Sequence, residues 1–357
     1  MRIVHVNLGG PAVSVDGIAS VVDTLVEAQQ NRADDVDAYT DRDFEARGAV
    51  RGVLTAWRIY GRVLAAQPDV VHMHSVYRPA HAVLALLLRR KRVPYVVSPH
   101  SGLAAGSRGR QRWRKAAYIS LVERRALAKA SAVLCLTDVE GDDVHAVAPR
   151  AITLVVPNPG PTPAVEAPDV PADGHLLTLC RFDVEQKGLD VLVEIGRRMP
   201  ALRFRVFGET DVNDPARATT LIASAPPNVT FEAPVRGAQK AHLIKTASAY
   251  IQPSRWEGQS ISVLEALAAG VPCIVSRYVA LTLGTELAEL TTVIDDDPST
   301  AARQISDALA DRPALTAAAL RARDIVRDRY SAGTICDELE RAYTRAISGR
   351  EPIGARR

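Results

Sequence analysis

The chain has 357 residues, of which 47% are hydrophobic and 24% are charged, and its formal net charge is +3. This length and composition predict about two globular domains and exclude a protein that is mainly disordered, collagen-like or coiled coil. The four cysteines lie far apart and include no Cys-x-x-Cys pair. Their spacing argues against a disulfide framework or a zinc knuckle and favours a reducing cytoplasm.

Short apolar runs alternate with longer helical patterns along the whole chain. The runs lie at residues 3–8, 70–74, 95–99, 132–136 and 152–156, and again at 176–180, 204–207, 249–252, 273–276 and 292–294. Most are continuously apolar, which is typical of parallel strands buried on both faces. Helical patterns, such as residues 18–28 and 263–269, lie between them. We therefore predict a doubly wound α/β architecture.

A proline-rich segment separates the two series of runs. Six prolines fall within residues 157–171, and such a segment forms neither a helix nor a central strand. We predict a Rossmann-like N-terminal domain over residues 1–157, a semi-rigid linker over 158–173 and a second parallel-sheet domain over 174–332. Because ligands bind beyond the carboxyl ends of parallel strands, we expect the two domains to face a shared cleft. Residues 349–357 are expected to form a flexible tail.

The strongest chemical signal is a pair of glutamates, Glu257 and Glu265, with seven residues between them. Ser260 or Ser262 can cap the helix that follows Glu257, and the free amides of its first turn offer an anion site. Glu265 lies on an otherwise apolar stretch, where a carboxylate needs a partner or a ligand hydroxyl. A phosphate at the helix start and a ribose on Glu265 would describe a nucleotide. The alternative is a glutamate placed there by the helix dipole alone.

A second signal follows the predicted strand at 176–180. Arg181 lies at the carboxyl end of that strand, and Lys187 lies just before a helix. The two could converge on one diphosphate, because arginine offers a fork of donors and lysine a point charge. The alternative is a solvated loop in which these cations pair with Asp183 and Glu185.

Together these elements resemble the GT4 family of retaining glycosyltransferases (glycosyltransferase group 1), which have the GT-B fold. The resemblance rests on Arg181, on Lys187-Gly188, on the Glu257-x7-Glu265 element and on the Ala-Ala-Gly-Val-Pro sequence that follows it. It continues, in the family's order, through residues 68–75, 94–102, 156–158, 229–235 and 322–331.

The resemblance implies that the C-terminal domain binds a nucleotide-diphosphate sugar. Arg181 and Lys187 would hold the diphosphate, Glu265 the ribose and Glu257 the donor sugar. His100 would face the donor sugar from the N-terminal domain, and the last helix, 333–348, would pack back on that domain. The catalytic candidates are thus His100, Glu257, Arg181 and Lys187. The further donor-binding candidates are Gly9, Gly10, Gly17, Gly258, Gln259, Ser260 and Ile261.

The resemblance also implies transfer with retention of the anomeric configuration and no carboxylate nucleophile. We expect neither a metal ion nor another cofactor, and we interpret the Asp-x-Asp sequences at 35–37, 41–43 and 295–297 as surface loops. His72 and His74 lie on one face of a strand without a carboxylate pattern, so we predict no metal there. We expect His74 to line the cleft and His72 to be packed.

Three positions depart from the family's pattern. Cys180 replaces the glycine before the loop arginine, Pro159 replaces the glycine after Asn158, and Gln259 lies where the family has phenylalanine. The backbone N–H donors are kept despite these three changes. We therefore expect the changes to reshape the donor-sugar pocket and not to alter the reaction class.

One segment of the chain is strongly basic. Residues 89–129 hold twelve Lys/Arg and one acidic residue, Glu123, which leaves a net charge of −8 on the rest. We predict that residues 108–129 bind an anionic membrane surface; the alternative is a solvated arginine-rich face. Nucleic-acid binding is not predicted. The N-terminus predicts a first strand rather than a signal peptide, and no apolar run spans a membrane. We therefore expect a cytoplasmic enzyme, peripheral on the inner face of the cell membrane, with a glycan or lipid-linked acceptor.

Two other functions remain open at this point. A different sugar-nucleotide enzyme on the same fold, such as an epimerase, would convert the donor without an acceptor. A catalytically silent GT-B protein would bind and scaffold. A dinucleotide dehydrogenase is not favoured, because no G-x-G-x-x-G follows the first strand.

Overall fold

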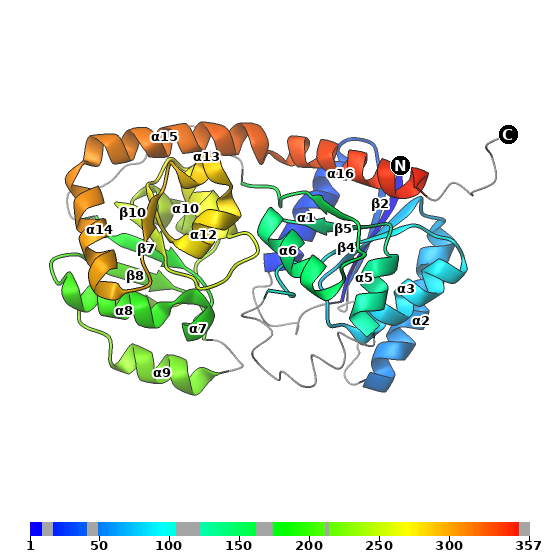
Figure 1. The fold of residues 1–357 in the computed structure, drawn as a ribbon, viewed down its shortest axis with the longest axis horizontal. Helices are drawn as coiled ribbons and strands as arrows, with labels where there is room; N and C mark the ends of the chain where they lie inside the picture. The colour runs from blue at the N-terminus through cyan, green and yellow to red at the C-terminus, as the bar shows by residue number, and fades with distance from the viewer. Residues whose placement is uncertain (9–16, 41–48, 105–121, 162–173, 211–213, 350–357) are drawn as a thin grey trace. The chain divides into compact units, whose positions relative to one another are not determined.

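The computed structural model describes residues 1–8, 17–40, 49–104, 122–161, 174–210 and 214–349. The chain divides into two compact units (Figure 1). Unit 1 comprises Met1–Pro159 and Ala332–Arg357, and unit 2 comprises Gly160–Ser331. Each unit is an α/β domain built on a six-stranded parallel sheet.

The sheet of unit 1 has the strand order β2-β1-β3-β4-β5-β6. Its strands are β1 (Arg2–Asn7), β2 (Asp35–Thr40), β3 (Val70–His74), β4 (Tyr95–Ser98), β5 (Ala132–Cys135) and β6 (Thr153–Val155). Its helices are α1 (Gly17–Gln30), α2 (Ala49–Ala66), α3 (Pro79–Arg90), α5 (Arg124–Lys129), α6 (Asp138–Val147) and α16 (Ala332–Ser348). The chain order reverses between β1 and β3, so their carboxyl ends form the topological switch point at which open α/β sheets bind ligands.

The sheet of unit 2 has the order β12-β11-β10-β7-β8-β9, with its switch point between β7 and β10. Its strands are β7 (Leu176–Leu179), β8 (Phe204–Phe207), β9 (Val229–Glu232), β10 (Ala249–Gln252), β11 (Cys273–Ser276) and β12 (Thr292–Ile294). Its helices are α7 (Val184–Lys187), α8 (Leu189–Arg198), α9 (Pro215–Ala223), α10 (Gly237–Lys245), α11 (Ile261–Ala268), α12 (Arg277–Leu283), α13 (Thr285–Ala288), α14 (Pro298–Ala310) and α15 (Arg312–Arg329).

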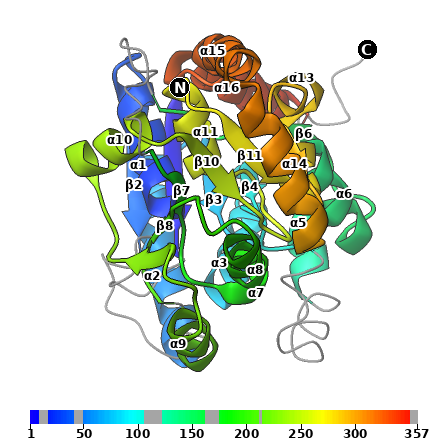
Figure 2. The same cartoon turned by 90° about the vertical axis from the view of Figure 1, so that its left-hand side faces the viewer.

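The central strands are buried on both faces, as their continuously apolar sequences predicted. In unit 2, Leu177 and Tyr250 belong to a core shared with α11 and α15. Their neighbours Leu176 and Ile251 belong to a second core shared with α8 and α14, on the opposite face (Figure 2). Full burial of each such side chain contributes about 1.5–3 kcal/mol, so these strands hold the residues that follow them in a fixed place.

All ten predicted strands are present, and their ends differ from the predicted ones by at most one residue. The two unpredicted strands, β2 and β9, are edge strands, each paired on one side only. Both are partly exposed, so neither needs a continuous apolar run. The interpretation of Asp35 and Asp37 as loop residues was wrong, because both belong to β2.

The last helix, α16, packs within unit 1. The Tyr343 hydroxyl lies 2.7 Å from His72 Nδ1 of β3, and Arg32 donates to the carbonyl oxygen of Gly333 at 2.8 Å. Among the described residues, no helix is long and apolar enough to cross a membrane.

Candidate functional site

The loop after β7 opens the site of unit 2. Asp183 caps α7, accepting a hydrogen bond from the Gln186 amide at 3.0 Å. Gly188, which has φ +62°, lies between the two helices as the C-cap of α7 and the N-cap of α8. A Cβ at Gly188 would lie 2.1 Å from the carbonyl oxygen of Pro253. Only glycine fits there, and this close approach fixes Lys187 beside the loop after β10.

Lys187 and Glu257 form a buried ion pair at this point. Glu257 Oε1 accepts three hydrogen bonds: from Lys187 Nζ at 2.5 Å, from Gln252 Nε2 at 2.8 Å and from Ser254 Oγ at 2.8 Å. The side chains of Glu257 and Lys187 are 8% and 16% exposed. Three donors, one of them a cation, offset the cost of burying the carboxylate.

The first turn of α11 lies against the same cluster. Ser260 caps α11, its Oγ accepting from the Val263 amide at 3.4 Å, and it also donates to Gln252 Oε1 at 2.9 Å. Gln252 therefore links Glu257 to the helix start, and Gln259 and Ser260 are both buried. The first amides of α11 and the Lys187–Glu257 pair thus lie at one end of β10, where a helix N-terminus favours an anion.

Two further contacts connect the loop after β7 with the loop after β10. The Arg255 guanidinium donates two hydrogen bonds to the Asp190 carboxylate, both at 2.8 Å. The Arg255 amide donates to the carbonyl oxygen of Gln186, also at 2.8 Å. Bidentate arginine–carboxylate pairs have a fixed geometry, so the two loops form one structure at the switch point.

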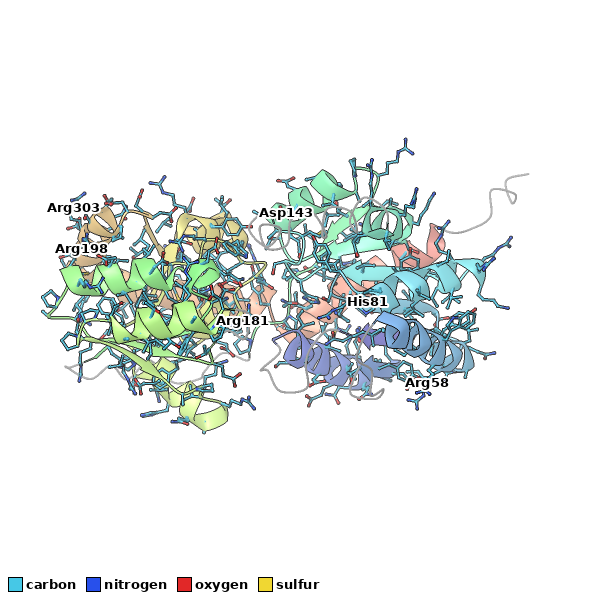
Figure 3. All side chains as sticks on the ribbon, turned by 90° about the horizontal axis from the view of Figure 1, so that it is seen from below. Arg58, His81, Asp143, Arg181, Arg198 and Arg303 are labelled. Atoms are coloured by element: carbon cyan, nitrogen blue, oxygen red, sulfur yellow. The ribbon has the colours of Figure 1, made fainter. Side chains whose placement is uncertain are left out.

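Arg181 extends from the same loop with about half of its side chain exposed (Figure 3). Its Nη2 donates to Gln186 Oε1 at 3.2 Å and lies 3.9 Å from Asp183 Oδ2. The pairing with Asp183 that the alternative interpretation named is present. Glu185 instead contacts Arg217, at 3.5 Å. Arg181 and Lys187 therefore belong to one loop at the carboxyl end of β7, where two cations can meet a diphosphate.

Glu265 has a partner within unit 2. Nζ of Lys240, on α10, lies 2.6 Å from both carboxylate oxygens of Glu265. The side chains of Glu265 and Lys240 are 19% and 29% exposed. Sequence reasoning predicted that this carboxylate needs a partner but missed Lys240, which is 25 residues upstream on another helix.

In unit 1, His100 follows β4 in an unfavourable backbone conformation. His100 has φ +49° and Ser101 has φ +59°, which cost non-glycine residues about 1–3 kcal/mol each. The buried carboxylate of Glu140 holds this turn: Oε1 accepts from the Ser101 amide at 2.5 Å and Oε2 from the Leu136 amide at 2.7 Å. Glu140 therefore fixes the position of His100. Sequence reasoning missed it, although Thr137-x-x-Glu140 is a helix-capping pattern.

The titration of Glu140 gives a testable pH dependence. Burial raises the pKa of Glu140 from 4.5 to about 7, although hydrogen bonds from Leu136 and Ser101 oppose the rise. Because the pKa of Glu140 is higher in the folded than in the unfolded protein, protonated Glu140 contributes stability in full at a pH below its unfolded pKa. This contribution is lost as the pH rises to about 7. We expect the free energy of unfolding of the wild type, minus that of Glu140→Gln, to fall by on the order of 3 kcal/mol between pH 4.5 and about 8. Urea unfolding measures it; a pH-independent difference would contradict the account.

His72 and His74 lie on one face of β3, with ring centroids 4.0 Å apart. His72 is packed as expected, between the Tyr343 hydroxyl and Ser98 Oγ, at 2.7 and 2.8 Å. His74 is 0% exposed and contacts His5 and His100. It therefore lies in the core of unit 1 behind His100, and does not itself form the exposed lining that we expected.

Several predicted residues lie outside the described part of the chain. They are Gly9, Gly10, Asp41, Asp43 and residues 108–121 of the basic segment. Gly17 is the first residue of α1. In the third Asp-x-Asp sequence, Asp297 caps α14 by accepting from the Thr300 amide at 2.8 Å, and Asp295 pairs with Arg277 at 2.6 Å.

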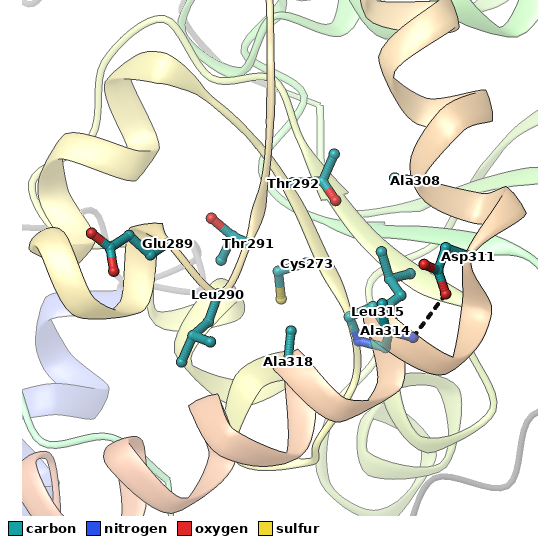
Figure 4. A pocket seen from close by; sticks show the side chains of 11 residues that line it. Cys273, Glu289, Leu290, Thr291, Thr292, Ala308, Asp311, Ala314, Leu315 and Ala318 are labelled. Carbon is teal, nitrogen blue, oxygen red and sulfur yellow. Dashed lines mark hydrogen bonds between the residues drawn. The ribbon is translucent and has the colours of Figure 1, made fainter.

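A pocket of about 200 Å³ lies elsewhere in unit 2 (Figure 4). Its lining includes Cys273 and Thr292, the first residues of β11 and β12, together with Asp311 and Leu315 of the α14–α15 region. It therefore lies at the amino ends of the strands, on the opposite edge of the sheet from Lys187 and Glu257. None of the predicted site residues lines it.

Family models match both halves of the chain. Residues 16–159 match the glycosyl transferase 4-like domain, and residues 173–311 match the glycosyl transferases group 1 domain. The chain belongs to the group 1 glycosyltransferases. In this glycosyltransferase, His100 lies within the first match, and Arg181, Lys187, Glu257 and Glu265 lie within the second.

Solved structures share the fold over nearly the whole chain. Sucrose-phosphate synthase from Thermosynechococcus elongatus has a TM-score of 0.80 at 17% identity, covering 98% of this chain and 100% of that one. Anabaena HepE, in complex with UDP and glucose, has a TM-score of 0.72 at 14% identity, covering 96% and 99%. The catalytic domain of starch synthase IV from Arabidopsis thaliana, bound to ADP and acarbose, has 0.71 at 13%, covering 98% and 99%. These likenesses establish the GT-B fold predicted from the sequence. No curated protein matches the sequence.

Proposed function

We propose that this glycosyltransferase moves a sugar from a nucleoside-diphosphate donor to an acceptor with retention of the anomeric configuration and without a metal ion. The observation that carries the proposal is the Lys187–Glu257 ion pair at the switch point of unit 2, next to the first amides of α11. Arg181, Lys187 and these amides supply positive charge and donors where a diphosphate would lie.

Each residue has a role that follows from its chemistry. A lysine ammonium has three N–H donors, so Lys187 can keep Glu257 while it donates to the diphosphate. As the bond between sugar and phosphate breaks, Arg181 and Lys187 stabilise the charge on the leaving group, the task that a metal performs elsewhere. Glu265 accepts from the ribose in place of, or together with, Lys240.

Glu257 is proposed to bind the sugar rather than attack it. Its Oε1 already accepts three hydrogen bonds, which lowers its nucleophilicity, and the carboxylate retains lone pairs for a sugar hydroxyl. The acceptor oxygen then attacks on the face that the phosphate leaves, and its proton passes to the departing phosphate oxygen. This scheme needs no pair of carboxylates about 5 Å apart, as retaining glycosidases do.

The donor base and the acceptor belong to the same proposal. Structures of the same fold contain UDP, in HepE, and ADP, in starch synthase IV, which supports a nucleotide donor here. We propose a glycan or lipid-linked acceptor bound by unit 1, with residues 108–129 on an anionic membrane surface. The support is the local excess of Lys/Arg, each worth about 1 kcal/mol near such a surface.

Turnover of a panel of sugar nucleotides tests the reaction class. The protein is incubated with UDP-, GDP- and ADP-sugars and simple sugar acceptors, and free nucleoside diphosphate and product anomer are followed by NMR. We expect release of the diphosphate from one donor family, with the anomeric configuration kept in the product. A sugar changed on intact donor would indicate an epimerase. Nucleotide binding without any conversion would indicate a binding protein.

A further inference from the structure

A line of hydrogen-bonded side chains runs through the core of unit 1 from α1 to His100. His5 Nε2 lies 2.8 Å from Gln29 Oε1, and His5 Nδ1 lies 2.9 Å from His74 Nε2. His74 Nδ1 lies 3.0 Å from His100 Nε2. Gln29, His5 and His74 are 2%, 0% and 0% exposed. The line crosses β1 and β3, the two strands of the switch point in unit 1.

These rings are neutral. Burial lowers the pKa of His5 and of His100 to about 4, and it lowers the pKa of His74 well below the ordinary value of 6.5. A neutral imidazole carries one N–H donor and one acceptor nitrogen. Because each ring uses one nitrogen for each neighbour, the hydrogen bonds in the line must all run in the same direction.

Gln29 sets that direction. Its carbonyl oxygen only accepts, so His5 carries its proton on Nε2 and accepts on Nδ1. His74 then donates from Nε2 and accepts on Nδ1, and His100 donates from Nε2 to His74.

We propose that Gln29 is a positioning residue that, through His5 and His74, keeps His100 in the Nε2–H tautomer with an accepting Nδ1. Among the residues that the structure describes, none is hydrogen-bonded to Nδ1 of His100. A lone pair accepts from a hydroxyl and repels the oxygen of a carboxylate or phosphate.

A metal site is the rival explanation for this cluster. The ligand nitrogens of His5, His72 and His74 all lie within 4.8 Å of one another. All six ring nitrogens, however, already have hydrogen-bond partners, and the three rings are at most 1% exposed. A metal would have to break these bonds in the dry core, so the hydrogen-bonded line is the better account.

Histidine tautomers are read directly from two-bond ¹H–¹⁵N correlation spectra of the free, ¹⁵N-labelled protein. We expect His5, His74 and His100 as Nε2–H tautomers. His81 is an internal reference, because we expect it as the opposite, Nδ1–H tautomer. Its Nδ1 lies 3.3 Å from the Ser75 carbonyl oxygen, which only accepts. His100→Asn assigns the His100 signals. An Nδ1–H His100, or stoichiometric zinc in the purified protein, would overturn the proposal.

Two variants test the role of Gln29 itself. Gln29→Met removes the acceptor at similar size, and we expect the His100 signals to change to the Nδ1–H form or a mixture of tautomers. Ser98→Ala removes a buried partner of His72 and should leave His100 unchanged. An unchanged His100 in Gln29→Met would show that Gln29 does not set the tautomer.

Discussion

Replacing Lys187 with alanine will slow donor turnover about 100–1000-fold and destabilise unit 2. Lys187 Nζ lies 2.5 Å from Glu257 Oε1, and its loss leaves this carboxylate, among the described residues, with Gln252 and Ser254 as hydrogen-bond partners. Removing one partner of a buried pair costs about 3–5 kcal/mol. Removing a donor to the charge that develops on a leaving group costs about 100–1000-fold in rate. Urea unfolding and nucleoside-diphosphate release measure the two effects.

The double variant Lys187→Ala/Glu257→Gln separates these effects. Neutralising Glu257 removes the unpaired buried charge, so we expect stability to recover substantially while turnover stays slow. Lys240→Ala is the matched control, because it breaks the other lysine–glutamate pair of unit 2, whose side chains are more exposed. We expect it to cost about 1 kcal/mol. Full turnover in Lys187→Ala would remove Lys187 from the reaction.

Replacing Gly188 with alanine will force apart the loop after β7 and the loop after β10. The new Cβ would lie 2.1 Å from the backbone oxygen of Pro253, at a φ of +62°. Pro253 directly follows β10, and Gly188 directly follows Lys187. Moving the two backbones apart would therefore move Lys187 away from Glu257. We expect a loss of on the order of 4 kcal/mol in the free energy of unfolding, together with loss of turnover.

Gly237 supplies the matched control for this prediction. It has φ +55°, and a Cβ there would meet nothing within 4 Å. Gly237→Ala therefore carries the conformational cost without the overlap, and we expect a loss of about 1 kcal/mol in urea unfolding. Equal losses in the two variants would contradict the assigned contact between Gly188 and Pro253.

The part of the fold predicted from sequence is the part that burial dictates. Central strands such as β3 and β10 are covered on both faces, so their apolar runs mark them directly. The edge strands β2 and β9 are partly exposed and have mixed sequences. The apolar pattern that found the other strands does not mark them, because polar residues alternate with apolar ones in both. The edge strands β6 and β12 were still predicted, because their sequences Thr-Leu-Val and Thr-Val-Ile form short apolar runs.

The residues of the candidate site likewise divide into those that local sequence motifs indicated and those that they did not. Lys187 and Glu257 were predicted because each lies in a local motif. Their partner Gln252 was missed, although a polar residue that ends an apolar strand indicates a buried hydrogen bond. Lys240 and Gln29 gave no local signal, since their partners Glu265 and His5 come from other elements of the fold. Tertiary contacts of this kind depend on how the elements of the fold are arranged, and the spacing of residues along the sequence does not indicate them.

Binding of UDP, GDP and ADP to the purified protein tests the central claim most directly. We predict that one nucleotide raises the melting temperature of the wild type, corresponding to about 2.7 kcal/mol at a hundredfold excess over Kd. The rise should vanish in Arg181→Ala and persist in Arg303→Ala, whose arginine lies at the opposite end of unit 2 (Figure 3). No shift with any nucleotide in a cooperatively melting protein, or an equal shift in Arg181→Ala, would contradict the account.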